Sequence, residues 1–283
     1  MAVMAVFIVS AVVAQAQTGD LERARALYQQ TKYPEALRIV ETIQPQAPVS
    51  FALAGLCHYM MGDYKKAAEV FEKAVAGDEG NSVYWDWLGR AYGKRAETSN
   101  FLTAPVYARR ARQHFEKAVE LDPANIEAAD DLFEYYLQAP GLLGGGEDKA
   151  AALTEKVREK APAKYHSMRA RLEEKRKDLG AAAEHWRQAA EAAPNEPGRY
   201  VDLARFLARQ GRHSESDAAF DSAAKIAPDR AQTKFQRART YIETGRNLEL
   251  ARKLLQEYLN SPLTPDDPSP AEAEQLLQEI PGG

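Results

Sequence analysis

The sequence predicts an all-α protein, a solenoid of about seven antiparallel helix pairs closed by a C-terminal capping helix. Three observations lead to this fold class: apolar stripes with helical spacing, prolines that recur at a fixed period, and a composition rich in alanine. Alanine favours helix because it loses no side-chain entropy there, and it allows two helices to approach closely. The chain has 283 residues, of which 45% are hydrophobic and 28% charged, so it has enough apolar material for a core.

The repeat period is visible in the prolines, since Pro194, Pro228 and Pro262 lie 34 residues apart. Each follows an apolar stripe, which before Pro194 consists of Ala182, Trp186 and Ala189. Spacings of four and three residues place such side chains on one face of a helix. The proline then ends the helix, because it has no amide hydrogen and its ring clashes with the preceding turn.

A second amphipathic segment precedes each of these helices. In one repeat it carries Tyr200, Leu203 and Leu207, and the turn that follows begins with Gly211. Glycine suits the left-handed backbone conformation in which many helices end. The unit that repeats is therefore a pair of helices joined by a short turn.

At this point the sequence resembles the tetratricopeptide repeat family. One repeat carries the family pattern as Trp85, Leu88, Gly89, Tyr92, Ala111, Phe115, Ala118 and Pro123. The repeat before it carries the pattern as Phe51, Gly55, Gly62, Tyr64, Ala67, Phe71 and Ala74. The resemblance covers about residues 18–263 and implies a right-handed superhelix with a concave groove. In this family the first helix of each pair lines the groove, which usually binds partners.

The predicted organisation is a signal peptide at 1–16 followed by one solenoid at 17–283. The expected helix pairs are 18–48, 49–80, 82–123, 124–162, 163–194, 195–228 and 229–262, with a cap at 271–280. Two pairs depart from the family length. The third has about ten extra residues between its helices, within 93–109, and the fourth has about five extra residues in 140–146.

The N-terminus predicts export. Ala2 to Val13 form an uncharged apolar run, and Ala14 and Ala16 suit a signal peptidase that cleaves after Ala16. The run is shorter than the roughly 20 residues of a membrane-spanning helix, so no permanent membrane anchor is expected. No Lys or Arg precedes the run, and a buried N-terminal helix is the alternative. The favoured location is the periplasm or the exterior.

Candidate partner-binding residues come from the first helices. On the family pattern, the equivalent groove-facing positions hold Arg90, Arg171, Arg205 and Arg239, the last three spaced by 34 residues. Guanidinium groups at repeat intervals suit the carboxylates of an extended acidic peptide. The alternative is that each arginine pairs with an acid of a nearby helix. Acids available for this are Asp86, Asp130, Glu134, Asp202 and Glu243.

The glycine-rich stretch 140–146 contributes a second set of candidate contacts, Leu142, Leu143 and Gly144. It is not a phosphate-binding loop, because no lysine follows the last glycine directly and no strand precedes it. Glycines in series are expected where the backbone needs positive φ angles or packs closely. Insertions in repeat proteins tend to lie on one face and to contact the ligand, and the segment 98–106 is a further candidate.

No catalytic, metal-binding or cofactor-binding pattern is present in the sequence. The five histidines have no metal-ligand spacing on one helix, and paired cysteines and nucleotide-binding glycine motifs are missing. The single cysteine, Cys57, lies in an apolar helix and is expected to be buried. A net charge of −4 and a basic segment 156–177 with few aromatic residues do not favour nucleic acid.

The sequence therefore predicts a non-catalytic scaffold or adaptor that binds a protein or peptide partner in its groove. An accessory or regulatory subunit of an envelope enzyme, transporter or assembly complex is the alternative, because both would have the same sequence features. No cofactor is expected.

Overall fold

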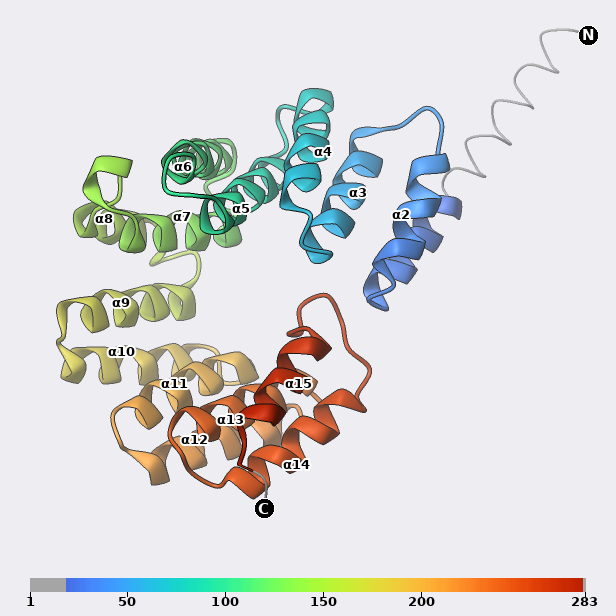
Figure 1. The fold of residues 1–283 in the computed structure, drawn as a ribbon. Helices are drawn as coiled ribbons and strands as arrows, with labels where there is room; N and C mark the ends of the chain where they lie inside the picture. The colour runs from blue at the N-terminus through green and yellow to red at the C-terminus, as the bar shows by residue number, and fades with distance from the viewer. Residues whose placement is uncertain (1–18, 282–283) are drawn as a thin grey trace, which may run out of the picture. The chain divides into compact units, whose positions relative to one another are not determined.

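The computed structural model describes residues 19–281, and these residues form helices and turns with no strand. The predicted signal peptide, 1–16, lies outside the described residues. The helices follow one another as pairs, and the expected all-α fold with a final capping helix is confirmed (Figure 1).

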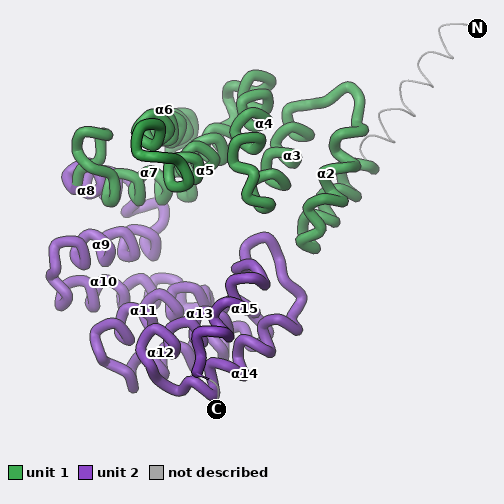
Figure 2. The backbone as a smooth tube through the Cα atoms, in the orientation of Figure 1, with its two compact units in different colours: residues 1–146 green, residues 147–283 purple. Residues whose placement is uncertain are grey.

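The chain divides into two compact units, residues 1–146 and 147–283 (Figure 2). In unit 1 residues 19–29 are helical, followed by α2 (Tyr33–Thr42), α3 (Pro48–Met60), α4 (Tyr64–Gly77), α5 (Ser82–Thr98), α6 (Ala104–Leu121), α7 (Ile126–Gln138) and the 3-10 turn η1 (Gly141–Leu143). Unit 2 holds α8 (Glu147–Val157), α9 (Pro162–Arg176), α10 (Leu179–Ala192), α11 (Pro197–Arg209), α12 (His213–Ile226), α13 (Ala231–Glu243), α14 (Leu248–Leu259) and α15 (Pro270–Glu279). The boundary falls between α7 and α8, the two helices of the expected fourth pair.

Local signals in the sequence account for the helix ends. Asp63, Asn81 and Asp178 each accept a backbone amide hydrogen with their side chains at the start of α4, α5 and α10. Such caps satisfy amides that have no partner inside the helix. At the other end, Gly211 has a φ of +70° and Gly245 a φ of +64°, the left-handed conformation expected of these turns.

The core of unit 1 depends on glycines that face phenylalanine rings. A Cβ atom added at Gly89 on α5 would lie 2.6 Å from the ring of Phe115 on α6. Likewise, a Cβ atom added at Gly55 on α3 would lie 2.9 Å from the ring of Phe71 on α4. The two helices of a pair therefore approach closely only because the side chain is missing at this repeat position. Cys57 is fully buried in the same core, as expected.

Unit 2 has two apolar clusters. One is formed by α9 to α12 around Trp186, Phe206 and Phe220. The other joins α13 and α14 to the last helix, where Leu276 packs with Phe235, Tyr258 and their neighbours. The short helix α15 therefore covers the apolar face of the last pair, which is the role expected of the C-terminal cap.

The extra residues of the third pair lie within 93–109, but most of them are helical and do not form a connection between the helices. They lengthen both helices, to 17 residues in α5 and 18 in α6, and leave only residues 99–103 as the connection. Across the two added turns, Arg95 of α5 donates a hydrogen bond of 2.8 Å to the Tyr107 hydroxyl of α6. A lengthened pair satisfies its own backbone hydrogen bonds, which a loop of that size would leave to water.

Among residues 19–281, no helix combines the length and apolar character needed to cross a membrane.

Candidate functional site

Unit 1 contains a pocket of about 470 Å³ between neighbouring first helices. Helix α5 contacts α3, α6 and α7, and each of these four helices contributes side chains to the lining. The lining comes from Tyr59, Arg90, Gly93, Lys94, Ala96, Glu97, Ala108, Ala111, Phe115, Asp131, Glu134, Tyr135, Gln138, Ala139, Pro140 and Leu143. We call this the α5–α7 pocket. It brings together two sequence-predicted contacts, Arg90 and Leu143, that are 53 positions apart in the chain.

The pocket combines apolar walls with a charged rim. Phe115, Leu143 and several alanines form the walls, and the rim holds Lys94 paired with Glu97 at 2.7 Å. Gly93 faces the cavity from the middle of α5, and a Cβ atom there would meet nothing within 4 Å. An apolar cavity with a few polar groups at its edge is the usual form of a small binding site.

Arg90 lies at one side of this pocket among three carboxylates. Its Nε atom donates to Asp131 of α7 and lies 3.1 Å from the Asp86 carboxylate one turn back on α5. Glu127 of α7 lies 4.0 Å from the guanidinium. Arg90 therefore joins two consecutive first helices, and it contacts acids of its own chain as the alternative interpretation of the sequence expected.

Burial of this cluster changes its ionisation. The Asp86 side chain is 4% exposed, and burial raises its pKa to about 8, against the favourable charge of Arg90. Burial also raises the pKa of Asp131, and the two nearby carboxylates raise the pKa of Arg90 despite the burial of that side chain. One guanidinium cannot fully compensate the buried Asp86 carboxylate and the partly buried Asp131 carboxylate, so Asp86 holds its proton near neutral pH.

Aromatic side chains complete the same side of the pocket. The Arg90 guanidinium lies 4.6 Å from the centre of the Trp87 ring, and Tyr59 meets the same ring edge-on at 5.3 Å. Burial raises the pKa of Tyr59 to about 12, so it is a neutral hydrogen-bond donor at the pocket wall. A cation over an aromatic face is held there by the ring quadrupole.

The glycine-rich loop is tied to α7 and α6. The Tyr135 hydroxyl donates to the Leu143 carbonyl at 2.9 Å, and the Gly146 amide donates to the Tyr136 carbonyl at 2.8 Å. Gly144 has a φ of +89°, and a Cβ atom there would lie 1.7 Å from the Arg112 guanidinium. Positive φ and close packing were the two expected reasons for these glycines. Of the three predicted loop contacts, only Leu143 lines the pocket, and Leu142 is 78% exposed.

The other three predicted arginines lie in unit 2, on α9, α11 and α13. Burial raises the pKa of the partly buried Asp202 carboxyl. The nearby charges of Arg171 and Arg205 lower this pKa but do not outweigh the burial. The buried Nε atom of Arg205 has no hydrogen-bond partner among the described residues. Arg239 is more exposed, and its Nε atom lies 3.4 Å from Glu243 on the same helix. Whether these arginines contact a partner stays a prediction.

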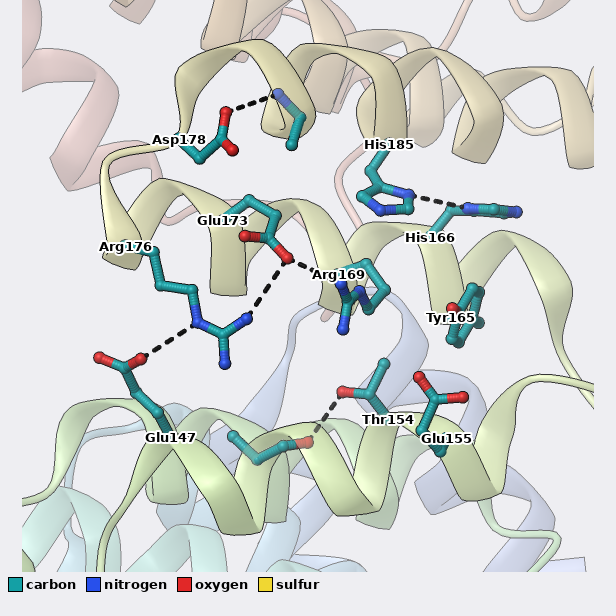
Figure 3. A network of polar contacts seen from close by, with 12 residues as sticks. Glu147, Thr154, Glu155, Tyr165, His166, Arg169, Glu173, Arg176, Asp178 and His185 are labelled. Atoms are coloured by element: carbon teal, nitrogen blue, oxygen red, sulfur yellow. Dashed lines mark hydrogen bonds and ion pairs between the residues drawn. The ribbon is translucent and has the colours of Figure 1, made fainter.

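A polar network joins α8, α9 and α10 in unit 2 (Figure 3). Arg176 lies 3.3 Å from Glu147 of α8 and 3.5 Å from Glu173 of its own helix. His166 of α9 and His185 of α10 face each other, with their Nδ1 atoms 3.2 Å apart. Spacing in the sequence did not reveal this pair, because its members belong to two helices. Residues 19–281 contain no group of three or more His, Cys, Asp or Glu that could hold a metal.

The fold and pocket define a helix-pair repeat protein with a pocket between its first helices. Residues 21–82 match a family model described as tetratricopeptide repeat. A thermophilic tetratricopeptide repeat protein from Thermus thermophilus has a similar structure, with 21% identity, a TM-score of 0.55, and coverage of 68% of this chain and 98% of that one. A tetratricopeptide repeat protein from Parabacteroides merdae is 14% identical, with a TM-score of 0.59 and coverage of 94% of this chain and 99% of that one. Residues 21–82 therefore match the tetratricopeptide repeat family, and the chain shares the fold of solved tetratricopeptide repeat proteins.

Similarity of fold does not identify the ligand. Human IFIT1, whose structure is a dimer with m7Gppp-AAAA, has 16% identity and a TM-score of 0.55 over 93% of this chain and 62% of its own. Its ligand is a property of that protein. The chain matches no curated protein.

Proposed function

We propose that this protein is a non-catalytic scaffold or adaptor, and that the α5–α7 pocket binds an apolar side chain of a partner peptide. The family and the fold support a role in protein–protein interaction. The observation that supports the finer proposal is the pocket itself, about 470 Å³ in volume, with apolar walls and a rim that holds the Lys94–Glu97 ion pair. A side chain the size of Leu or Phe fits such a volume, and its burial supplies much of the affinity.

In this proposal Arg90 positions the pocket, and it does not provide a free cation for the partner. Its guanidinium bonds Asp131 and lies close to Asp86, so a peptide carboxylate would have to displace them. Acidic residues of a partner are proposed to meet Arg171, Arg205 and Arg239 on the first helices of unit 2, because their spacing of 34 residues matches the repeat. Guanidinium groups at repeat intervals match carboxylates along an extended chain.

The test uses peptides selected from a displayed library on the purified protein. Gly93→Leu fills the pocket from α5 without a clash at Cβ, and Gly93→Ala leaves most of it open. Gly198→Leu is the matched control, because Gly198 lies in α11 of unit 2 and a Cβ there also meets nothing within 4 Å. We expect Gly93→Leu to raise the Kd by about tenfold or more, as loss of one buried apolar side chain would. Equal affinity of Gly93→Leu and the wild type would show that the pocket is not the site.

A second arm tests the arginines. Arg171, Arg205 and Arg239 are changed to Glu together, and binding of the selected peptides is measured again. Weaker binding of acidic peptides, with unchanged binding of neutral ones, is the expected result. If acidic peptides bind the variant as tightly as the wild type, these arginines have no role in recognition.

We also propose that the protein acts in the periplasm or outside the cell. The support is the apolar run from Ala2 to Val13 and the small residues at 14 and 16. N-terminal sequencing of the protein purified from its source is the test. A mature chain that begins at Gln17 is expected, and an intact Met1 would contradict export by this signal.

A further inference from the structure

One end of unit 1 gathers apolar side chains in an exposed position. Phe101 is 83% exposed and Leu102 71%, both in the short connection between α5 and α6, and Val106 and Met61 are exposed nearby. These four are half of the large apolar side chains that are exposed among the described residues. Exposed apolar side chains that are gathered in one place mark an interaction surface, whereas scattered single ones do not.

The end is built from two neighbouring turns. A small hollow there is lined by Asp63 of the α3–α4 turn, by Lys65 in the first turn of α4, and by Arg95, Ser99 and Tyr107 of the α5–α6 hairpin. The turns that carry Met61 and Phe101 therefore lie side by side. We call this surface the α5–α6 tip, meaning residues 61–66 and 94–110.

The tip is ordered by its own hydrogen bonds. The side-chain oxygen of Asn100 accepts from the amides of Leu102 and Thr103, at 3.0 and 3.2 Å. The guanidinium of Arg95 lies 4.1 Å from the centre of the Tyr107 ring, which joins the last turn of α5 to the first turn of α6. Phe101 and Leu102 are thus held outward by a defined turn and do not fold back onto a helix.

The tip is basic in a chain whose net charge is −4. It contains six Lys or Arg side chains and two carboxylates, Asp63 and Glu97. Each carboxylate already has a lysine partner, Lys66 at 3.2 Å and Lys94 at 2.7 Å. Lys65 and Arg109 are exposed, and neither has a carboxylate within ion-pair distance among the described residues.

We propose that the α5–α6 tip docks on the surface of an anionic phospholipid bilayer. The apolar side chains enter the boundary between headgroups and acyl chains, and the basic side chains meet the anionic headgroups. A projecting tip needs a matching cavity in a protein partner, whereas a bilayer receives it without one. The combination of a few apolar side chains with basic neighbours is the two-part signal that gives reversible membrane binding.

Vesicle binding of the purified chain tests the proposal. Flotation is measured with vesicles of phosphatidylcholine alone and of phosphatidylcholine mixed with phosphatidylglycerol. We expect binding to the mixed vesicles only, weakened as salt rises from about 0.1 M to about 0.5 M because the Debye length falls. A wild-type protein that ignores the mixed vesicles, or binds both kinds equally, would overturn the proposal.

Variants locate the contact. Phe101→Asp with Leu102→Asp is expected to lower vesicle binding by about tenfold or more, since it removes both inserted side chains. Leu142→Asp is the matched control, because Leu142 is 78% exposed on η1 of the same unit but lies outside the tip. Lys65→Glu with Arg109→Glu tests the charges. Equal losses in the control and the double variant, or no loss in either, would show that the tip is not the docking surface.

An environment-sensitive label gives a direct readout of insertion. Cys57 is fully buried, and burial raises the pKa of its thiol to about 12, so it does not compete for a thiol-reactive dye. A dye on Phe101→Cys should shift to the blue on mixed vesicles and be quenched by nitroxide lipids. A dye on Leu142→Cys should do neither. An unchanged spectrum at position 101 would contradict insertion.

Discussion

The guanidinium of Arg90 on α5 donates a hydrogen bond to the carboxylate of Asp131 on α7, one repeat further along the chain. The same guanidinium lies 3.1 Å from Asp86. Two consecutive first helices are therefore joined by one cation between carboxylates, at the side of the α5–α7 pocket. The contacts that shape this side of the pocket therefore also affect the pKa values of Asp86 and Asp131.

Removing the cation should destabilise unit 1. Arg90→Met is expected to lower the free energy of unfolding by about 2–3 kcal/mol, because it leaves the buried Asp86 and the partly buried Asp131 without their cation; the figure allows for the partial exposure of Arg90. Adding Asp131→Asn should restore part of this loss. Urea unfolding measures both, with Arg239→Met as control, since its ion pair with Glu243 is exposed and worth at most about 1 kcal/mol. Additive effects of the two changes would contradict the coupling.

Asp86 should make stability fall as pH rises from about 4 to about 8. Its folded pKa of about 8 lies above the unfolded value of about 4, so the folded state binds the extra proton between these values. Stability from this group is complete below pH 4 and is lost progressively up to pH 8. In Asp86→Asn the loss between pH 6.5 and 8 should disappear, as measured by urea unfolding at each pH. Parallel curves for the two proteins would contradict a raised pKa.

His114 should act in the opposite direction at lower pH. It stacks on Tyr92 with ring centres 5.3 Å apart, and burial lowers its pKa to about 4. Because the unfolded pKa is about 6.5, the unfolded state binds the extra proton between pH 4 and 6.5, and stability rises with pH there. His114→Phe keeps the stacking and removes this contribution, so between pH 4 and 6.5 its stability should fall more with rising pH than that of the wild type. The slope between pH 6.5 and 8 should stay unchanged, and a flattening there instead would contradict the assignment.

Gly144 should not tolerate a side chain. Gly144→Ala is expected to cost about 1–3 kcal/mol, because its φ of +89° is strained for alanine and the new Cβ atom would strike Arg112. Gly141→Ala is the control, since a Cβ atom there meets nothing within 4 Å and its φ is not positive. Thermal unfolding of the two variants is the measurement. Similar unfolding temperatures would show that the loop can rearrange at little cost.

The helices and their pairing could be predicted because their signals are local. Apolar stripes, capping residues such as Asp63, turn glycines such as Gly211 and the 34-residue proline period all act within one or two turns of helix. The cap near 271–280 followed from its apolar stripe in the same way. The pocket itself was not predicted, because the family pattern locates the first helices but not the cavity between them. Arg90 and Leu143, which line it, were predicted only as partner contacts.

The sequence by itself determined that this chain is a series of helix pairs, since backbone conformation depends on neighbouring residues. Only the tertiary structure decided which distant side chains meet: Arg90 with Asp131, His166 with His185, and the two turns of the α5–α6 tip. It also decided that the extra residues of the third pair lengthen α5 and α6. The physical reason is that contacts between helices depend on their rotation and offset. Close approaches such as that of Gly89 to Phe115 fix the rotation and offset of the helices, and the repeat period of the sequence does not specify these approaches.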